Sequence, residues 1–259
     1  MKFTVLLSMI FLFLVTNLEA QSKDTITTKS GLKYFLTKHG NGKDIDSGSI
    51  VVQHYTVWLS NGDKLDSSRD LNSPFAYEHP KLIKGTNEAL SLMKVGDRGI
   101  FIMPYYLAYG EKGDHEVPPK ETLTFDIEIL DVKEHFLRKV LLDVLYDKSF
   151  KTDSIPKIKE TLLKYQQLKK EGFSNLYTDQ YELNAVGYKL INKFPKDALE
   201  IFKQNTIEYP NESNPYDSLG DCYVKLGENE LAIDNFEKAL EIDPTRSNTL
   251  QKLQKLTGK

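Results

Sequence analysis

The chain has 259 residues, which at about 150 residues per domain is enough for one large domain or two small ones. Its 34 basic and 37 acidic residues give a formal net charge of -3, which argues against the clustered Lys and Arg of a nucleic-acid-binding surface. Hydrophobic residues make up 40% and charged residues 27%, as in a soluble globular protein. The single cysteine excludes a disulfide within this chain and any metal site built from several cysteines.

Residues 1–20 have the pattern of a secretory signal peptide. Lys2 precedes an uncharged apolar run, residues 3–15, that is too short to span a bilayer comfortably. Ala20 supplies a small residue at the expected cleavage point, so the mature chain would begin at Gln21. An uncleaved N-terminal anchor is the alternative. The pattern predicts export to the periplasm or out of the cell, with no stable membrane span after processing.

Between residues 31 and 133 the apolar residues recur with the period of β-strands. Asn61-Gly62 is a strong signal for a hairpin turn, and Pro104 is expected to end a strand. Gly96 is expected to close a short helix. The predicted elements are strands at residues 49–59, 98–103 and 122–129 and a helix at residues 86–93. This half is predicted to be a small α+β unit, an antiparallel sheet with one short helix.

After Glu134 the apolar residues follow the period of α-helices, which predicts a domain boundary and two connecting helices in residues 134–178. Ser154 and Pro156 stand where the cap and first turn of the second helix are expected, and Gly172 where it ends. The predicted apolar face of the first helix is Phe136, Leu137, Val140, Leu141, Val144 and Leu145, and that of the second is Ile155, Ile158, Leu162, Tyr165 and Leu168.

The last part of the chain contains an internal repeat. Ala198, Phe202 and Pro210 recur as Ala232, Phe236 and Pro244, each displaced by 34 residues, which is the period of tetratricopeptide (TPR) repeats. In the second unit the TPR signature positions are held by Leu219-Gly220, Tyr223, Leu226-Gly227, Ala232, Phe236, Ala239 and Pro244. We interpret them as packing positions with no direct function. Repeats are predicted at about residues 180–212 and 213–246, followed by a closing helix whose apolar residues are Leu250, Leu253 and Leu256.

The sequence lacks the usual motifs for covalent, phosphoryl or redox chemistry. The five histidines form no pair four residues apart and no HExxH motif, and GxSxG, P-loop, GxGxxG and CxxC motifs are missing. We therefore expect no metal and no cofactor. The first half does concentrate aromatic residues near predicted loops, and composition alone favours an ordinary aromatic core. They include Tyr55, Phe75, Tyr77, Tyr105, Tyr106, Tyr109 and Phe125.

Short motifs in the first half follow one another in a characteristic order. They are His54-Tyr55-Thr56, Asn61-Gly62, Leu65-Asp66-Ser67-Ser68-Arg69, Pro74-Phe75, Leu82-Ile83-Lys84-Gly85, Met93-Lys94-Val95-Gly96, Ala108-Tyr109-Gly110, Pro118-Pro119 and Thr122-Leu123-Thr124-Phe125-Asp126. Over about a hundred residues this order and spacing resemble the FKBP-type peptidyl-prolyl isomerases. The resemblance implies an antiparallel sheet curled around one short helix. The expected organisation is a linker at residues 21–30, an FKBP-like α+β domain at residues 31–133, and an all-α TPR-like domain at residues 179–259.

The resemblance also implies a proline-binding pocket, in which the Tyr109 hydroxyl and the Ile83 N–H would donate hydrogen bonds to the carbonyls of a bound peptide. The implied catalytic residues are Tyr55, Asp66, Tyr109 and Phe125, and the implied substrate-binding residues are Phe75, Leu82, Ile83, Thr86 and Val117, with Val117 at the rim. Cis-trans isomerisation of a prolyl peptide bond needs no acid, base or nucleophile, because it is only a rotation about an amide bond. The barrier to that rotation is about 18–20 kcal/mol. An apolar wall and fixed donors suffice to favour the twisted state.

Several residues depart from the family pattern. Thr86 stands where the family has a tryptophan that floors the pocket, and Leu65 replaces a phenylalanine. Val57 replaces a common glycine, Glu116 adds a charge, and residues 78–81 form a shortened segment. The leading hypothesis is a secreted or periplasmic isomerase of weakened activity that assists the folding of exported proteins by acting on their proline-containing segments. The alternative is a non-catalytic protein that captures such segments while the TPR tail recruits a protein partner.

Overall fold

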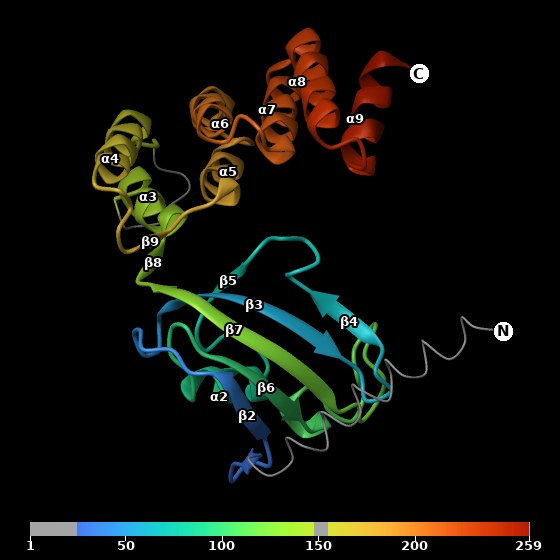
Figure 1. The fold of residues 1–259 in the computed structure, drawn as a ribbon. Coiled ribbons are helices and arrows are strands. Elements are labelled where there is room, and N and C mark those ends of the chain that lie inside the picture. The colour runs from blue at the N-terminus through green and yellow to red at the C-terminus, as the bar shows by residue number, and fades with distance from the viewer. Residues whose placement is uncertain (1–24, 148–154, 259) are drawn as a thin grey trace, which may run out of the picture. The chain divides into compact units, whose positions relative to one another are not determined.

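The computed structural model describes residues 25–147 and 155–258 (Figure 1). The predicted signal peptide lies outside these residues. The chain divides into two compact units, Met1–Lys133 and Glu134–Lys259, each of which is described by itself. Within the described ranges, every helix is too short or too polar to cross a membrane.

The first unit is an antiparallel sheet in the strand order β1-β2-β6-β7-β3-β4, with β5 also paired to β3. Its elements are β1 (Ile26–Thr27), β2 (Lys33–Lys38), β3 (Ile50–Trp58), β4 (Lys64–Ser67), β5 (Phe75–Glu78), α2 (Lys84–Ser91), β6 (Arg98–Met103), the short 3-10 helix η2 (Tyr105–Leu107) and β7 (Leu123–Lys133). This is the predicted α+β arrangement, and strands occur at all three predicted places. The Asn61-Gly62 hairpin joins β3 to β4, with Gly62 at φ +92°.

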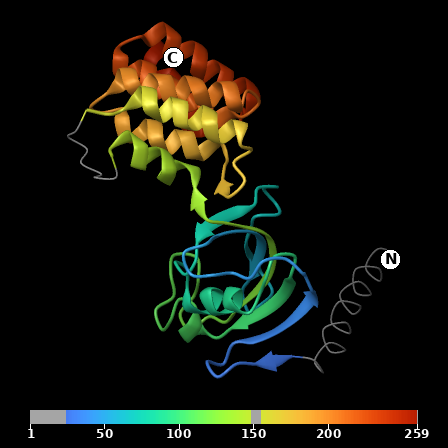
Figure 2. The same ribbon diagram turned by 90° about the vertical axis from the view of Figure 1, so that its left-hand side faces the viewer.

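The long central strands β3 and β7 are paired along their length, and Trp58 at the end of β3 lies opposite Thr124. Figure 2 shows α2 against the curved sheet. Gly85 allows this close approach, because a Cβ at that position would lie 2.7 Å from the sulfur of Met103 on β6. The core between helix and sheet consists of Leu32, Val51, Tyr77, Ala89, Leu90, Met93, Phe101, Met103, Leu107, Ile127, Ile129 and Val132.

Helix α2 begins two residues before the predicted position and ends at Ser91. The Asn87 side chain causes the early start, since it accepts a hydrogen bond from the Leu82 N–H at 3.1 Å and donates one to the Leu82 carbonyl at 2.6 Å. Gly96 does not close this helix as predicted. With φ +92° it forms part of the turn that leads into β6, where the Asp97 N–H donates to the Lys94 carbonyl at 3.0 Å.

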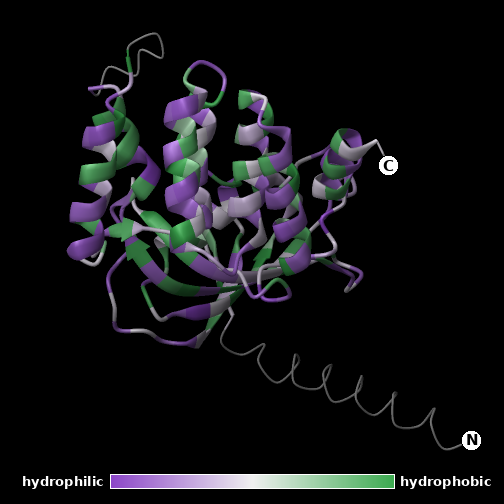
Figure 3. Ribbon diagram, turned by 90° about the horizontal axis from the view of Figure 1, so that it is seen from above, coloured by the Kyte–Doolittle hydropathy of each residue, from purple (hydrophilic) through white to green (hydrophobic). Residues whose placement is uncertain are grey.

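The second unit consists of helices and one short two-stranded parallel sheet, β8-β9. Its elements are β8 (His135–Phe136), α3 (Leu137–Leu145), α4 (Ile158–Lys170), β9 (Leu176–Tyr177), α5 (Gln180–Leu190), α6 (Pro195–Glu208), α7 (Ser213–Leu226), α8 (Asn229–Ile242) and α9 (Ser247–Thr257). Helices α5 to α9 pack in chain order, each against the next. Figure 3 shows apolar and polar residues alternating around the helices, as expected when one side packs and the other meets solvent.

Two predictions for the connecting helices are wrong in detail. Phe136 lies in β8 rather than on a helix, and its ring meets the Tyr177 ring edge-on with centroids 5.7 Å apart. The second helix begins at Ile158, because the Lys157 N–H donates to the Leu145 carbonyl at 3.1 Å and holds the preceding residues outside the helix. Ile155 is consequently 86% exposed instead of buried. The predicted cap at residue 154 lies outside the described residues.

The repeat positions pack as predicted. A Cβ at Gly187 or Gly220 would come within 2.5 Å of the ring of Phe202 or Phe236, respectively, so each glycine lets a helix pair approach closely. The closing helix α9 differs from the prediction, because Leu250 is 44% exposed. Polar contacts also hold this helix: the Thr249 hydroxyl donates to Asp217 at 2.8 Å, and the Lys252 ammonium bridges Asp217 and Asp221. Leu253 and Leu256 are half-buried.

Candidate functional site

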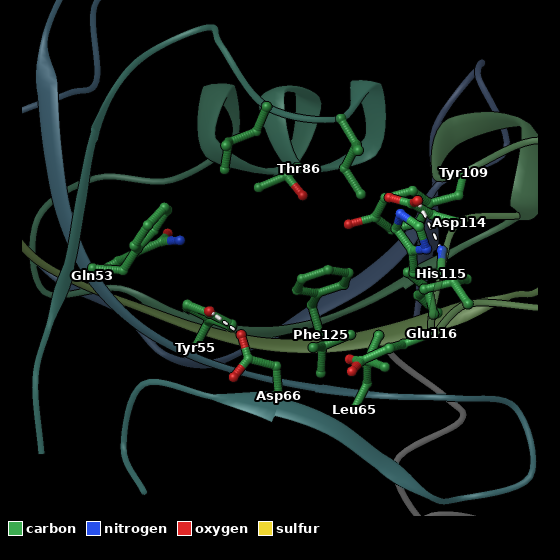
Figure 4. A pocket seen from close by; sticks show the side chains of 16 residues that line it. Gln53, Tyr55, Leu65, Asp66, Thr86, Tyr109, Asp114, His115, Glu116 and Phe125 are labelled. Carbon is green, nitrogen blue, oxygen red and sulfur yellow. Dashed lines mark hydrogen bonds between the residues drawn. The ribbon is translucent and has the colours of Figure 1, made fainter. Parts of the chain in front are cut away.

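The sheet unit contains a pocket of about 460 Å³ (Figure 4). All nine residues predicted from the family resemblance line it: Tyr55, Asp66, Phe75, Leu82, Ile83, Thr86, Tyr109, Val117 and Phe125. The remaining lining residues are Gln53, Val57, Leu65, Asp114, His115, Glu116 and Leu123. Trp58 does not line the pocket.

Strand register brings many of these side chains together. Gln53, Tyr55 and Val57 are two residues apart on β3 and therefore point to the same face. Phe75 on β5 is the partner of Gln53, and Phe125 on β7 is the partner of Val57. Side chains of directly paired residues lie about 5 Å apart, so three strands contribute one continuous wall.

Tyr55 and Asp66 form a hydrogen-bonded pair at the pocket. The Tyr55 hydroxyl donates to the Asp66 carboxylate, whose other oxygen accepts the Ser67 N–H at 2.7 Å. Burial of the Tyr55 ring raises the pKa of its hydroxyl, and the bond to Asp66 and its negative charge raise that pKa further. Tyr55 therefore stays protonated and remains a donor throughout the physiological range. The pair fixes both the ring and the carboxylate.

Tyr109 and Ile83 occupy the positions from which the family resemblance expects hydrogen bonds to a peptide. Tyr109 follows η2 and is 39% exposed. Burial, followed by the charges of Asp114 and Asp66, raises the pKa of its hydroxyl, so the group keeps its proton. Ile83 is the N-cap of α2, and its N–H therefore has no role in the helical hydrogen-bond ladder. Both residues can act as donors at the pocket.

The pocket also has an apolar side. Val57, Val117 and Leu123 are buried there, with Leu65 and Phe125 packed against them. The Phe75 ring meets the Tyr55 ring edge-on with centroids 5.8 Å apart and stacks on Tyr77 with centroids 5.3 Å apart. Such a wall can exclude water from a small apolar ring.

The inner end of the pocket is polar. Thr86 hangs from α2 across the pocket from Tyr55 and Phe125 (Figure 4), it is 2% exposed, and its hydroxyl faces the Met103 sulfur at 3.9 Å. Gln53 is also 2% exposed, and its Oε1 has no hydrogen-bond partner. Sequence analysis identified Thr86 and missed Gln53, although the two-residue spacing from Tyr55 would have placed it on the pocket face.

The rim of the pocket is formed by Asp114, His115 and Glu116. All three side chains are exposed. The Asp114 and Val117 backbones exchange two hydrogen bonds of 2.9 Å, which hold this turn in place. Sequence analysis singled out Glu116 as a departure from the family but not its two neighbours. Within the described ranges, no group of His, Cys, Asp or Glu side chains is arranged to hold a metal ion.

Comparison with known proteins finds family matches in two parts of the chain. Residues 42–130 match the family model of the FKBP-type peptidyl-prolyl cis-trans isomerase, and residues 218–246 match that of the tetratricopeptide repeat. A probable FKBP-type peptidyl-prolyl cis-trans isomerase of Haemophilus influenzae is 42% identical over 114 residues, which cover 44% of this chain and 47% of the relative. FkpA, an FKBP-type isomerase of Aeromonas hydrophila, is 37% identical over 115 residues, which cover 44% of this chain and 43% of the relative.

The chain spans about half the length of the curated relatives that it matches. A crystal structure of FkpA from Escherichia coli aligns with a TM-score of 0.43 and 33% identity, covering 45% of this chain and 55% of that one. The two family matches lie where the motifs predicted them. Residues 42–130 are therefore similar to FKBP-type peptidyl-prolyl cis-trans isomerases, and residues 218–246 are similar to a tetratricopeptide repeat.

Proposed function

We propose that the chain is a peptidyl-prolyl cis-trans isomerase that acts on proline-containing segments of exported polypeptides. The observation that carries this proposal is the convergence of Tyr55, Asp66, Tyr109 and Phe125 on one pocket in a domain of the FKBP type. Relatives that match the same domain are named as isomerases of this type.

In the proposed mechanism the proline ring of a segment enters between Phe125, Tyr55 and Phe75, and these rings remove water from the imide bond. The planar amide is stabilised by charge separation between its nitrogen and oxygen, so a dry pocket destabilises it relative to the twisted state. The Tyr109 hydroxyl and the Ile83 N–H hold the neighbouring carbonyls. Since only a bond rotation is required, no residue needs to gain or lose a proton.

Export is supported by the sequence of residues 1–20, where Lys2 and an apolar run precede Ala20. Expression in an exporting host should yield a chain whose intact mass corresponds to a start at Gln21. Recovery of the uncut mass in the membrane fraction would show that the segment is an anchor.

The TPR tail is proposed to bind a protein partner, as packed helical repeats commonly do.

A second candidate function is capture of proline-containing segments without catalysis. The polar inner end of the pocket, formed by Thr86 and Gln53, favours it, because a proline ring would find little apolar contact there. A protease-free isomerisation assay on a proline peptide separates the two functions. Acceleration of cis-trans exchange above the uncatalysed rate supports the isomerase, whereas saturable binding without acceleration supports capture.

A further inference from the structure

Apart from His115 on the rim, the charged side chains that line the pocket are acidic. Asp66 comes from β4, and Asp114 and Glu116 come from the rim (Figure 4). The lining contains no Lys or Arg. Two carboxylates on the rim and one on β4 generate a negative potential at this pocket, which the surrounding low-dielectric walls concentrate.

These carboxylates are not neutralised by nearby cations. Among the described residues, none of the three forms an ion pair. Asp66 is bonded only to a hydroxyl and a backbone N–H, and Asp114 accepts the His115 N–H at 2.8 Å. Lys120, on the same loop, is paired with Glu111 at 3.0 Å, away from the pocket lining.

Gln53 provides a second, independent indication of the ligand's chemistry. Its amide is directed into the same pocket (Figure 4), it is 2% exposed, and its Oε1 accepts no hydrogen bond. A buried acceptor without a partner is costly once water has been displaced. The inner end of the pocket therefore favours an occupant that brings a hydrogen-bond donor.

We propose that the pocket selects proline-containing segments in which Lys or Arg stands next to the proline. This inference rests on the proposed function, because it assumes that a proline ring occupies the pocket. Adjacent Cα atoms are about 3.8 Å apart, so the neighbouring side chain lies at the pocket mouth. A Lys or Arg stem is long and flexible enough to bring its charge to the rim carboxylates of Asp114 and Glu116.

The expected preference is moderate because the rim is exposed. An exposed charge pair contributes a factor of at most about five, so Asp114 and Glu116 together favour Lys over Leu by at most about twenty-five-fold. A Glu before the proline is repelled and should be disfavoured relative to Leu. Both effects should shrink at 1 M salt, where the Debye length falls to about 3 Å.

The experiment uses the purified chain and three peptides, Ala-Xaa-Pro-Phe, in which Xaa is Lys, Leu or Glu. The kcat/KM of isomerisation is measured for each peptide, and its affinity is measured in parallel by calorimetry. The expected order is Lys, then Leu, then Glu. The double variant Asp114→Asn/Glu116→Gln should reduce the Lys-to-Leu ratio at least threefold. The matched control Asp44→Asn/Asp46→Asn removes two exposed acids of the same unit that do not line the pocket, and it should leave the ratio unchanged.

The two measurements distinguish failure of this inference from failure of the proposed function. If no peptide is isomerised, the proposed function fails, and the affinities still decide the charge preference. Equal values for Lys and Leu peptides in both measurements would overturn the preference. A preference that is undiminished in the rim double variant, or that Asp44→Asn/Asp46→Asn reduces equally, would also overturn it, since it would then reflect the net charge of the domain.

Discussion

At the scale of single residues, Thr86 and Gln53 are the features that set this pocket apart. They lie on different elements, α2 and β3, and both are almost fully buried at its inner end. An aromatic side chain buries about 150–250 Å², which at about 25 cal/mol per Å² corresponds to several kcal/mol of apolar contact. With threonine in place of such a ring, the inner end of the pocket has less apolar surface. The unpaired Gln53 Oε1 then lies where a substrate would need a dry surface.

We therefore predict that Thr86→Trp raises isomerase efficiency by about ten- to a thousand-fold, because a ring restores the floor of the pocket. Gln53 should limit the gain, since the new ring would leave its amide unpaired in a drier site. The double variant Gln53→Val/Thr86→Trp should exceed the single one. The measurement is kcat/KM in the protease-free assay, with Phe125→Ala as the inactive reference.

Thermal unfolding of the same variants controls for overpacking, which typically costs about 1–3 kcal/mol. A stable Thr86→Trp variant without any gain would refute the idea that the floor limits activity. So would a wild-type chain that already isomerises efficiently.

The same residues show what could be predicted from the sequence. Tyr55, Tyr109 and Phe125 stand in recognisable motifs, so their presence in one pocket could be expected before any coordinates. Their catalytic roles remain predictions. Gln53 and Asp114 stand outside those motifs, so the motifs could not indicate that these two residues line the pocket. Strand alternation alone could have revealed Gln53, whereas the loop position of Asp114 follows no period.

At the scale of elements, Cys222 on α7 is buried against α6. Its side chain is fully buried, and its Sγ donates to the Pro195 carbonyl at 3.3 Å. Burial raises the pKa of this thiol to about 11, so little reactive thiolate forms near neutral pH. We predict a very slow reaction with a polar thiol reagent in the native state and a complete, rapid one in denaturant. A fast native reaction, or a disulfide-linked dimer on a non-reducing gel, would contradict this.

Glu182 on α5 links that helix to α3. Its carboxylate accepts a hydrogen bond from the Arg138 N–H at 2.8 Å and another from the Arg138 guanidinium. Burial raises the pKa of Glu182 from 4.5 to about 7, against the opposing effect of Arg138. Between these values the folded state holds a proton that the unfolded state has lost. The contribution of Glu182 to stability is therefore greatest below pH 4.5, falls as the pH rises toward 7, and levels off above that.

Glu182→Gln should remove this part of the pH dependence, because glutamine keeps the size of the side chain but does not titrate. The measurement is urea unfolding followed by far-ultraviolet circular dichroism at pH values on either side of the titration. Glu237→Gln, at an exposed position on α8, is the matched control. It should leave the slope of the unfolding free energy against pH unchanged. An unchanged slope in Glu182→Gln would show that Arg138 keeps the carboxylate ionised.

How well a strand or helix could be predicted from the sequence depends on its length. The predicted places of β3, β6 and β7 agree with the structure because each strand is long enough to display its period. The pair β8-β9 has two residues in each strand, too few to form a pattern. The start of α4 could not be predicted either, because a long-range hydrogen bond from Lys157 to Leu145 determines it.

At the scale of the whole molecule, each unit has its own hydrophobic core. Helix α3, the first after the boundary, contributes Leu137, Leu141 and Leu145 to the core of the helical unit. Neither core therefore needs the other to complete its apolar contacts.

We predict that a fragment of residues 21–135 unfolds cooperatively and retains the isomerase activity of the longer chain. The measurements are urea unfolding and kcat/KM of the fragment beside the full chain. Aggregation of the fragment, or complete loss of activity, would show that the helix beginning at Leu137 belongs to the first core.

The lone tryptophan has a practical consequence for such measurements. Trp58 is the only tryptophan of the chain and lies on β3, whereas every helix longer than the eight residues of α2, among those described, belongs to the other unit. Indole emission therefore reports on the sheet unit, while far-ultraviolet ellipticity reports mainly on the helical one. One denaturant titration of the unlabelled, unmutated protein, read through both signals, yields a separate midpoint for each unit.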